Sequence, residues 1–269
     1  DPQNAFVLGL GSGVTAGALA QYPLSQIDCA EIESAIIDAA RYFNEYNHSV
    51  LDDPRLNLIT ADGRNHLLAT SKRSDIIISE PSNPWLAGIS SLFTREHYKL
   101  CKSRLNQDGI MVQWVHTYSM SAHDFKMIVN TFRSAFPHSQ VWFSSKGDIL
   151  LIGKNNEIKI DYRVISERLA SFPEIRADLE KYSLDHPASI LGCFLLGEDD
   201  VQKFTILSEL NTDDMPLLEF SAPKNLYLHT TDKNFQGILR YKSSSLPPLT
   251  NFESKGPQTF VFYYHAGIF

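Results

Sequence analysis

A short apolar segment near the start of the sequence runs into a glycine-rich turn that could hold a nucleotide. Residues 5–10 (AFVLGL) are apolar, and residues 9–13 (GLGSG) lead into a helix of small residues. Glycines permit a tight turn and a close approach of the backbone, and the free N–H groups at the start of a helix attract a phosphate or another polar ligand. The spacing G-x-G-x-G differs from the G-x-G-x-x-G of dinucleotide enzymes, and such turns also occur without a ligand.

Two acids follow this turn, each at the end of an expected strand. Glu31 lies where a carboxylate can accept both hydroxyls of a ribose, although it could instead be a helix N-terminal charge, a role that suits Glu33 better. Asp62 could accept from an adenine amino group or cap the helix that starts at Gly63. The turn and the two acids together predict an adenosine site. Its candidate residues are Gly9, Gly11, Ser12, Gly13, Glu31, Asp62 and Gly63.

The elements that position these residues alternate between strand and helix over the first 155 residues. Strands are expected at 5–10, 26–32, 55–62, 75–81 and 109–115, with a final hairpin at 139–145 and 148–154. Helices are expected at 14–22, 33–47, 63–71, 95–105 and 125–136. Thr94 and the pair Ser121 and Asp124 are suited to cap the last two helices, and residues 106–109 (NQDG) are expected to end the fourth.

This order predicts an α/β, Rossmann-like fold with a seven-stranded, mostly parallel sheet and a terminal antiparallel hairpin. Right-handed crossovers place the loops that follow the parallel strands along one edge of the sheet. That edge collects the turn 9–13, Glu31, Asp62, residues 80–83 and Gln113. Ligands of open α/β sheets bind at this edge, so we expect the site there.

The second half of the sequence is more helical and less regular. Residues 161–172, 174–182 and 187–195 predict a small C-terminal helical appendage, and residues 211–223 are expected to return to the main domain. We therefore expect a nucleotide-binding domain over 1–155, and the appendage with the return segment of the same domain over 156–227. Residues 228–269 form a tail for which we make no prediction, except that residues 242–257 are typical of a loop or linker.

The composition argues against several classes of protein. A formal net charge of -7 disfavours general nucleic-acid binding and is compatible with a small cationic substrate. The three cysteines are widely spaced, so Cys29 and Cys101 are expected to be buried thiols in a reduced, cytoplasmic setting. His116 and His123 are not spaced as metal ligands, and we expect no metal. The sequence contains no run of about 18 apolar residues and no signal peptide, so no membrane span is expected within it.

Three blocks of the sequence closely resemble the spermidine and spermine synthases. They are residues 52–67 (DDPRLNLITADGRNHL), 74–88 (SDIIISEPSNPWLAG) and 92–114 (LFTREHYKLCKSRLNQDGIMVQW). The resemblance covers roughly residues 5–155, and a weaker resemblance extends over residues 211–227. It implies polyamine aminopropyltransferases with the fold of class I S-adenosylmethionine methyltransferases. The segments EPSNPW and NTDDMPLLEFSAP are most similar to a bacterial, spermidine-synthase-like subgroup. Some members of that subgroup are attached to membrane-spanning segments that lie outside the region resembling this sequence.

The resemblance implies a role for each residue that matches the family's motifs. Glu31 corresponds to the ribose-binding acid, and Asp62 to the acid that contacts adenine. Glu80 falls on the catalytic aspartate, which positions and helps to deprotonate the attacking amine. Asn83 falls on a second aspartate that helps to bind the polyamine, and Gln113 on a polar position that closes the site.

Three further residues are candidates for the substrate groove. Asp213 and Asp214 lie where the family's substrate residues tend to return, although a solvated loop or a helix cap is an equal alternative. Trp85 follows the loop after the fourth strand and would either wall the substrate pocket or pack beneath that loop.

The departures from the family pattern bear on the transferred group. Ser12 stands where the synthases carry an aspartate that holds the amine of decarboxylated S-adenosylmethionine, and a serine does not repel the carboxylate of intact S-adenosylmethionine. Glu80 keeps the catalytic charge but moves it by one methylene, and Asn83 loses one charge. The family also precedes its glycine turn with a small β-domain. Because the sequence begins four residues before the first strand, we expect that domain to be missing from it.

These residues lead to three hypotheses of function. The first is a transferase that uses decarboxylated S-adenosylmethionine or S-adenosylmethionine, with aminopropyl transfer to a polyamine. The second is a methyltransferase of a small acceptor, which Ser12 and Asn83 favour. The third is a non-catalytic nucleotide-binding or sensor domain attached to a membrane segment upstream. Homodimerisation is left open.

Overall fold

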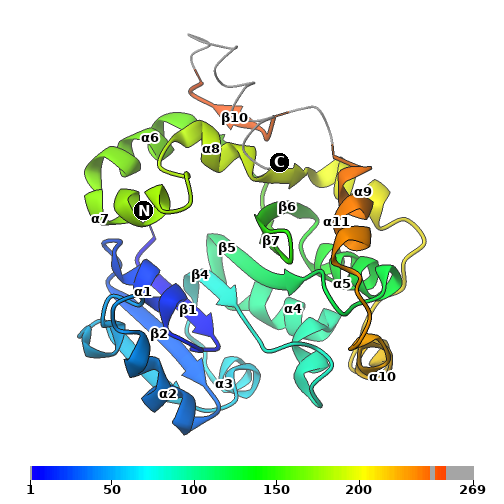
Figure 1. Ribbon diagram of the computed structural model, residues 1–269. Coiled ribbons are helices and arrows are strands. Elements are labelled where there is room, and N and C mark those ends of the chain that lie inside the picture. Colours follow the sequence, from blue (N-terminus) through cyan, green and yellow to red (C-terminus); the bar gives the residue numbers. More distant parts are fainter. Residues whose placement is uncertain (1, 243–245, 253–269) are drawn as a thin grey trace.

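The computed structural model describes residues 2–242 and 246–252 and contains one large central sheet (Figure 1). Its eight strands follow the spatial order β3-β2-β1-β4-β5-β7-β6-β9. The strands are β1 (Asn4–Leu8), β2 (Gln26–Glu31), β3 (Leu56–Thr60), β4 (Ser74–Ser79), β5 (Leu105–His116), β6 (His138–Ser145), β7 (Asp148–Lys154) and β9 (Phe194–Leu196). Strands β1 to β5 pair in parallel, whereas β7 pairs antiparallel with β5 and β6. The predicted α/β class, mostly parallel sheet and terminal hairpin are confirmed.

The expected count of seven strands is wrong by one. The segment 187–195, expected to be helical throughout, forms helix α8 (Pro187–Gly192) and then turns into strand β9. Strand β9 pairs antiparallel with β6, and its three apolar residues are fully buried. The unpaired backbone groups at the edge of β6 and the burial of three large apolar side chains outweigh the local helical pattern. The strand β5 also begins earlier than expected, at Leu105, which pairs with Ser74, and residues 106–109 form an irregularity in the register before Ile110 pairs with Ile76.

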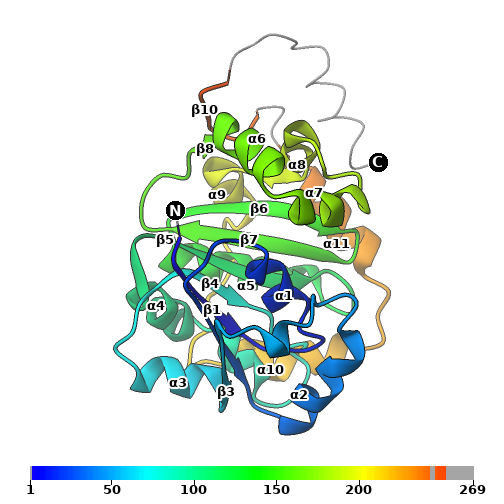
Figure 2. The same ribbon diagram turned by 90° about the vertical axis from the view of Figure 1, so that its left-hand side faces the viewer.

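Helices cover both faces of the sheet, because the side chains of the central strand β1 alternate between two cores. Ala5 and Val7 pack with helix α1 (Val14–Ala20), whereas Phe6 and Leu8 belong to the larger core on the other face. Helix α2 (Ser34–Ala40) lies on the α1 side. Helices α3 (Gly63–Ala69), α4 (Arg95–Ser103) and α5 (Ala122–Ala135) cover the other side (Figures 1 and 2).

The helix starts follow the capping rules that the sequence suggested. The Thr94 hydroxyl accepts a hydrogen bond from the His97 N–H at 3.3 Å, and the Ser121 hydroxyl accepts from the Asp124 N–H at 3.0 Å. Glu33, and not Glu31, caps α2 through the Ala35 N–H. The side chain of Glu31 is therefore left for another role.

The C-terminal half supplies the expected helices and some that the sequence did not reveal. Its further elements are β8 (Ile160–Asp161), α6 (Tyr162–Ser171), α7 (Pro173–Glu180), α9 (Glu198–Phe204), α10 (Leu217–Ser221), α11 (Thr231–Leu239) and β10 (Leu249–Thr250), with short 3-10 helices η1 (Arg41–Phe43), η2 (Val50–Asp52), η3 (Ile89–Phe93) and η4 (Ala222–Asn225). Helix α11 was not predicted, yet its Phe235 and Ile238 are buried in the main core. Of the expected loop 242–257, residues 243–245 and 253–257 lie outside the described residues.

Two cysteines have the expected surroundings. Cys29 in β2 and Cys101 in α4 are buried, and burial raises the pKa of each thiol to about 12. Among residues 2–242 and 246–252, no helix combines the length and the apolar character that crossing a membrane requires.

The packing of α1 against the loop before η2 gives a first testable prediction. A Cβ at Gly17 would lie 2.2 Å from the carbonyl oxygen of Asn47. Asn47 cannot move away easily, because it is buried and its amide donates to the carbonyls of Ser12 and Ala40. We expect Gly17→Ala to lower the free energy of unfolding by about 1–3 kcal/mol, measured by urea denaturation.

The matched control is Gly237→Ala in α11, where an added Cβ meets no atom within 4 Å. That change is expected to raise stability by about 0.4–1 kcal/mol, because alanine reduces the entropy of the unfolded chain. Equal stability of the two variants would contradict the packing described for α1.

Candidate functional site

The glycine turn after β1 brings three strand ends together. Gly9 has φ +92°, and a Cβ there would lie 2.6 Å from the carbonyl oxygen of Glu80, so only glycine fits. The Gly9 N–H donates to the Ala30 carbonyl at the end of β2, and the Glu80 N–H donates to the Leu8 carbonyl, both at 2.9 Å. The turn therefore lies between the carboxyl ends of β2 and β4.

Glu31 holds this turn and also faces a cavity. Its carboxylate is 8% exposed and accepts hydrogen bonds from the N–H groups of Leu10 and Glu33, each at 3.0 Å. A carboxylate offers about four lone-pair positions, so two such bonds leave acceptor capacity for a ligand. The arrangement is suited to a pair of hydroxyls.

Asp62 satisfies both of the alternatives that its position suggested. Its carboxylate caps α3 by accepting from the Asn65 N–H at 2.8 Å, and the residue also lines the same cavity as Glu31. One oxygen can serve the cap while the other faces a ligand.

Glu80 is the third acid at this edge of the sheet. Burial raises the pKa of its carboxyl above the ordinary value. A hydrogen bond from the Thr15 hydroxyl to Oε2, at 2.7 Å, lowers the pKa and offsets part of this rise. Thr15 lies in the first turn of α1 and was not singled out from the sequence. Only the folding of α1 against the end of β4 shows that its hydroxyl reaches Glu80.

These residues line one cavity of about 340 Å³, within the range of small-molecule sites. Of the predicted nucleotide residues, the cavity is lined by Gly9, Gly11, Glu31, Asp62 and Gly63, together with Glu80. The remaining lining is mostly apolar or small and comprises Leu8, Ala30, Ile32, Ile36, Pro81, Ser82, Ala87, Gly88, Ile89, Ser91 and Leu92. A mostly apolar cavity lined by three carboxylates can accommodate a flat base and a ribose.

Several lining residues were missed in the sequence, and one of them carried a signal. Ile32 directly follows Glu31 at the end of β2 and is 69% exposed. A large apolar side chain placed just beyond a strand end, with little protein to cover it, is a candidate to contact a ligand. Leu92 and Ile89 gave no comparable signal, because they lie in the short helix η3, which reaches the cavity only in the folded chain.

Ser12 and Gly13 do not line this cavity. The Ser12 carbonyl accepts from the Asn47 amide at 2.8 Å, which ties this part of the turn to the loop before η2. A role for Ser12 or Gly13 in binding therefore stays a prediction from the motif.

Of the expected substrate residues, Asn83 and Trp85 lie in the loop after β4 and Gln113 lies in β5, and none of the three lines the 340 Å³ cavity. The Tyr118 hydroxyl donates to Asn83 Oδ1 at 3.3 Å, and the Trp85 ring lies edge-on to His116 with centroids 4.8 Å apart. Gln113 is fully buried, and its amide donates to the carbonyls of Trp114 and Ser79. Trp85 also packs against the main core, as its packing alternative predicts.

His116 and Tyr118 complete this aromatic group, and the motifs did not point to either. Within the part of the chain that the structure describes, neither ring nitrogen of His116 has a hydrogen-bond partner, and burial lowers the pKa of the imidazole to about 4. The ring is therefore neutral at physiological pH. Burial also raises the pKa of the Tyr118 hydroxyl.

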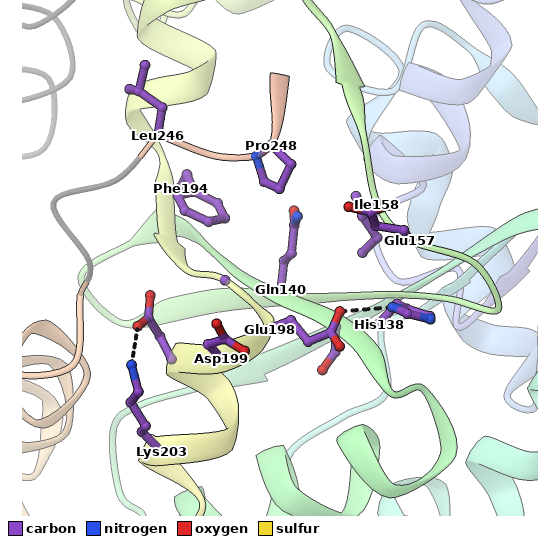
Figure 3. Close-up of a pocket in the computed structure, with 13 residues that line it drawn as sticks. His138, Gln140, Glu157, Ile158, Phe194, Glu198, Asp199, Lys203, Leu246 and Pro248 are labelled. Atoms are coloured by element: carbon purple, nitrogen blue, oxygen red, sulfur yellow. Dashed lines mark hydrogen bonds and ion pairs between the residues drawn. The ribbon is translucent and has the colours of Figure 1, made fainter. Parts of the chain in front are cut away.

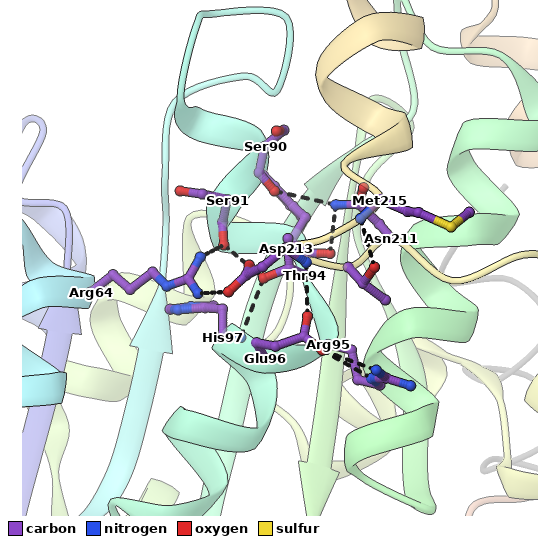
Figure 4. A network of polar contacts seen from close by, with 12 residues as sticks. Arg64, Ser90, Ser91, Thr94, Arg95, Glu96, His97, Asn211, Asp213 and Met215 are labelled. Atoms are coloured by element: carbon purple, nitrogen blue, oxygen red, sulfur yellow. Dashed lines mark hydrogen bonds and ion pairs between the residues drawn. The ribbon is translucent and has the colours of Figure 1, made fainter.

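Asp213 and Asp214 lie away from this cavity. Figure 4 shows Asp213 facing the Arg64 guanidinium, with which it forms an ion pair, and its N–H donates to the Glu96 carboxylate at 2.9 Å. Asp214 is exposed, and neither residue lines the cavity. Their expected contact with substrate remains a prediction, and the geometry gives Asp213 a structural partner instead.

A larger cavity of about 580 Å³ lies at the opposite edge of the sheet (Figure 3). It is lined by the start of β6 and by α9, and it includes none of the predicted site residues. Two of its acids already have partners, since Glu198 bonds to His138 Nδ1 at 2.8 Å and Asp200 pairs with Lys203. The smaller cavity, where the glycine turn and three acids meet, is therefore the candidate site.

The bond between Thr15 and Glu80 gives a prediction about acidity. A hydrogen bond to the charged carboxylate lowers its pKa, so Thr15→Val should raise the pKa of Glu80 further above the ordinary value. Thr15→Ser keeps a hydroxyl and should leave the pKa near that of the native protein. Carboxyl-carbon NMR titration of Glu80 measures all three, and identical pKa values in the three proteins would refute the contact.

Comparison with known proteins shows which family the chain is similar to. The family model described as spermine/spermidine synthase domain matches residues 1–145. A polyamine aminopropyltransferase of Clostridium perfringens is 32% identical over 143 residues, which cover 52% of this chain and 50% of the relative.

Solved structures share the fold. The spermidine synthase of Thermotoga maritima, 22% identical, covers 58% of this chain and 55% of its own, with a TM-score of 0.52. The match to a probable spermidine synthase of Corynebacterium glutamicum, 17% identical, covers 78% of this chain and 72% of that protein, with a TM-score of 0.58. The chain spans about half the length of the curated relatives that it matches. Since the family model matches more than half of its residues, the chain belongs to the spermine/spermidine synthase family.

Proposed function

We propose that this chain carries the donor-binding and catalytic part of a transferase that moves an aminopropyl group from decarboxylated S-adenosylmethionine to an amine. The observation that carries the proposal is that Glu31, Asp62 and Glu80 line one cavity with the glycine turn. The name of the Clostridium perfringens relative, polyamine aminopropyltransferase, supports the reaction class.

The donor would lie along the ends of β1 to β4. Glu31 would accept the two ribose hydroxyls, because its carboxylate faces the cavity while two backbone N–H groups hold it. The free side of Asp62 would accept from the adenine amino group. Ile32 and Leu92 would contact the faces of the base, and Gly9 and Gly11 leave room for the chain that ends in the sulfonium.

The sulfonium donor supplies an electrophilic carbon, whose bond to sulfur breaks as an amine nitrogen forms its new bond to that carbon. The electron pair of the broken bond stays on sulfur, leaving a neutral thioether. Glu80 would accept the proton that the amine loses. A carboxylate whose pKa is raised by burial is a better base than an exposed one, and the Thr15 hydroxyl fixes its orientation. Alignment of the reacting atoms at about 3–3.5 Å is the other requirement.

A second candidate is methyl transfer from intact S-adenosylmethionine to a small acceptor. Ser12 and Asn83 favour it, because neither carries a charge where the synthases have an acid. Asn83 is moreover engaged by the neutral Tyr118 hydroxyl. The third hypothesis, a non-catalytic nucleotide-binding or sensor domain, predicts that donor binds without turnover.

A turnover assay on the variant Glu80→Gln tests the catalytic role. With decarboxylated S-adenosylmethionine and a diamine, we expect kcat to fall by about 10²–10⁴-fold, as is typical when a general base is removed. The Kd of methylthioadenosine, measured by calorimetry, should change little. Glu209→Gln is the matched control, because Glu209 is exposed and does not line the cavity, and it should leave kcat unchanged.

The product distinguishes the candidates. Methylthioadenosine as product supports aminopropyl transfer, whereas S-adenosylhomocysteine formed from the intact donor supports methyl transfer. Unchanged kcat in Glu80→Gln would show that another group is the base.

A further inference from the structure

Residues beyond the part that the family model matches hold one wall of the donor cavity in place. This wall runs through Gly88 and the 3-10 helix η3, and it supplies five lining residues. They are Ala87, Gly88, Ile89, Ser91 and Leu92. Gly88 has φ +82°, so the chain turns sharply there before it follows the cavity.

The side chain of Glu219, in α10, binds this wall at two points. Its Oε1 accepts from the Gly88 N–H at 3.0 Å, and its Oε2 accepts from the Ser90 hydroxyl at 2.5 Å. The two contacts lie on either side of Ile89, which lines the cavity. Glu219 itself does not line the cavity, so it acts on the site only through the wall.

The segment before Glu219 fixes the position from which it reaches the wall. Asn211 is fully buried, and its amide donates to the carbonyls of Ser90 and Phe93 at 3.3 and 3.2 Å (Figure 4). Its Oδ1 accepts from the Leu218 N–H at 3.1 Å, directly before Glu219 in the chain. The start of α10 is thereby tied to η3.

A second tie joins the same segment to α3. Arg64 donates to the Ser91 carbonyl at 2.8 Å and pairs with the Asp213 carboxylate (Figure 4). Arg64 follows Gly63, which also lines the cavity. The segment 211–219 is therefore linked both to η3 and to the start of α3, and none of its residues lines the cavity.

We infer that Glu219 is a positioning residue for the donor site: its carboxylate holds residues 88–90 so that Ile89, Ser91 and Leu92 form the wall against which the adenosyl group binds. The inference rests on the proposed function, since it assigns the cavity to an adenosyl donor. A wall held in its binding conformation before the ligand arrives costs less to order on binding. The segment 211–219 acts through hydrogen bonds to this wall. This role does not require its acidic side chains to contact the substrate.

Glu219→Gln tests the inference with methylthioadenosine as the probe. The amide keeps one acceptor oxygen for the Gly88 N–H and turns an N–H toward the Ser90 hydroxyl, so both partners lose their charged acceptor. We expect the Kd measured by calorimetry to rise about tenfold, as for loss of a hydrogen bond to a charged group. The KM for decarboxylated S-adenosylmethionine should rise similarly while kcat changes less than threefold, and the Gly88 amide should exchange its hydrogen faster.

Two further variants separate positioning from a general loss of structure. Ser90→Ala removes one partner of the same carboxylate, so its effect on Kd should not add to that of Glu219→Gln in the double variant. Phe220→Ala changes the next residue of α10, which is 68% exposed, and should leave Kd unchanged.

The outcomes are distinguishable from failure of the proposed function. If the native protein binds no methylthioadenosine, the donor site itself is wrong. If the native protein binds it and both Glu219→Gln and Ser90→Ala bind it within twofold of the native Kd, the positioning role is refuted. A rise in KM and an equal fall in kcat in the control Phe220→Ala would also refute it, because the effect would then belong to α10 as a whole.

Discussion

The contact between Gly9 and the backbone of Glu80 is the constraint on which the site depends. A Cβ at this position would lie only 2.6 Å from the Glu80 carbonyl oxygen. Because glycine has no Cβ, the end of β1 can lie directly against the end of β4. The hydrogen bonds from Gly9 to Ala30 and from Glu80 to Leu8 then fix β2 and β4 on either side of the turn. This close approach lets the Thr15 hydroxyl of α1 reach the Glu80 carboxylate, and so joins the glycine turn to the proposed base.

The same geometry gives acids at one edge of the sheet different surroundings. Glu31 is held by two backbone N–H groups, which stabilise a carboxylate in place as a hydrogen-bond acceptor. Glu80 meets burial and a single hydroxyl, so its pKa is raised. One acid is thereby suited to binding and the other to proton transfer, a separation that sequence position alone does not create. After β4 and β5, the imidazole of His116 is neutral and the Asn83 amide is uncharged, so neither side chain adds a charge there.

The features that could be predicted from the sequence are those set by local pattern and by chain direction. The turn 9–13, Glu31, Asp62 and Glu80 follow strands that the apolar runs reveal, and parallel pairing places such residues on one edge. Capping by Thr94, Ser121 and Glu33 is likewise local. The contribution of Thr15, the strand β9 and the two contacts of Glu219 could not be predicted, because each depends on partners far away in the sequence. The ion pair of Asp213 could not be predicted for the same reason, since its partner Arg64 lies 149 residues earlier.

We propose that the cavity beside Gly9 binds an adenosyl sulfonium donor, and competition calorimetry of the native protein and Glu31→Gln measures that binding. We expect the native protein to bind decarboxylated S-adenosylmethionine more tightly than the intact donor. Glu31→Gln should weaken the binding of both about tenfold or more, because an amide cannot accept both ribose hydroxyls while it holds two backbone N–H groups. No measurable binding of either donor or of methylthioadenosine to the native protein would contradict it.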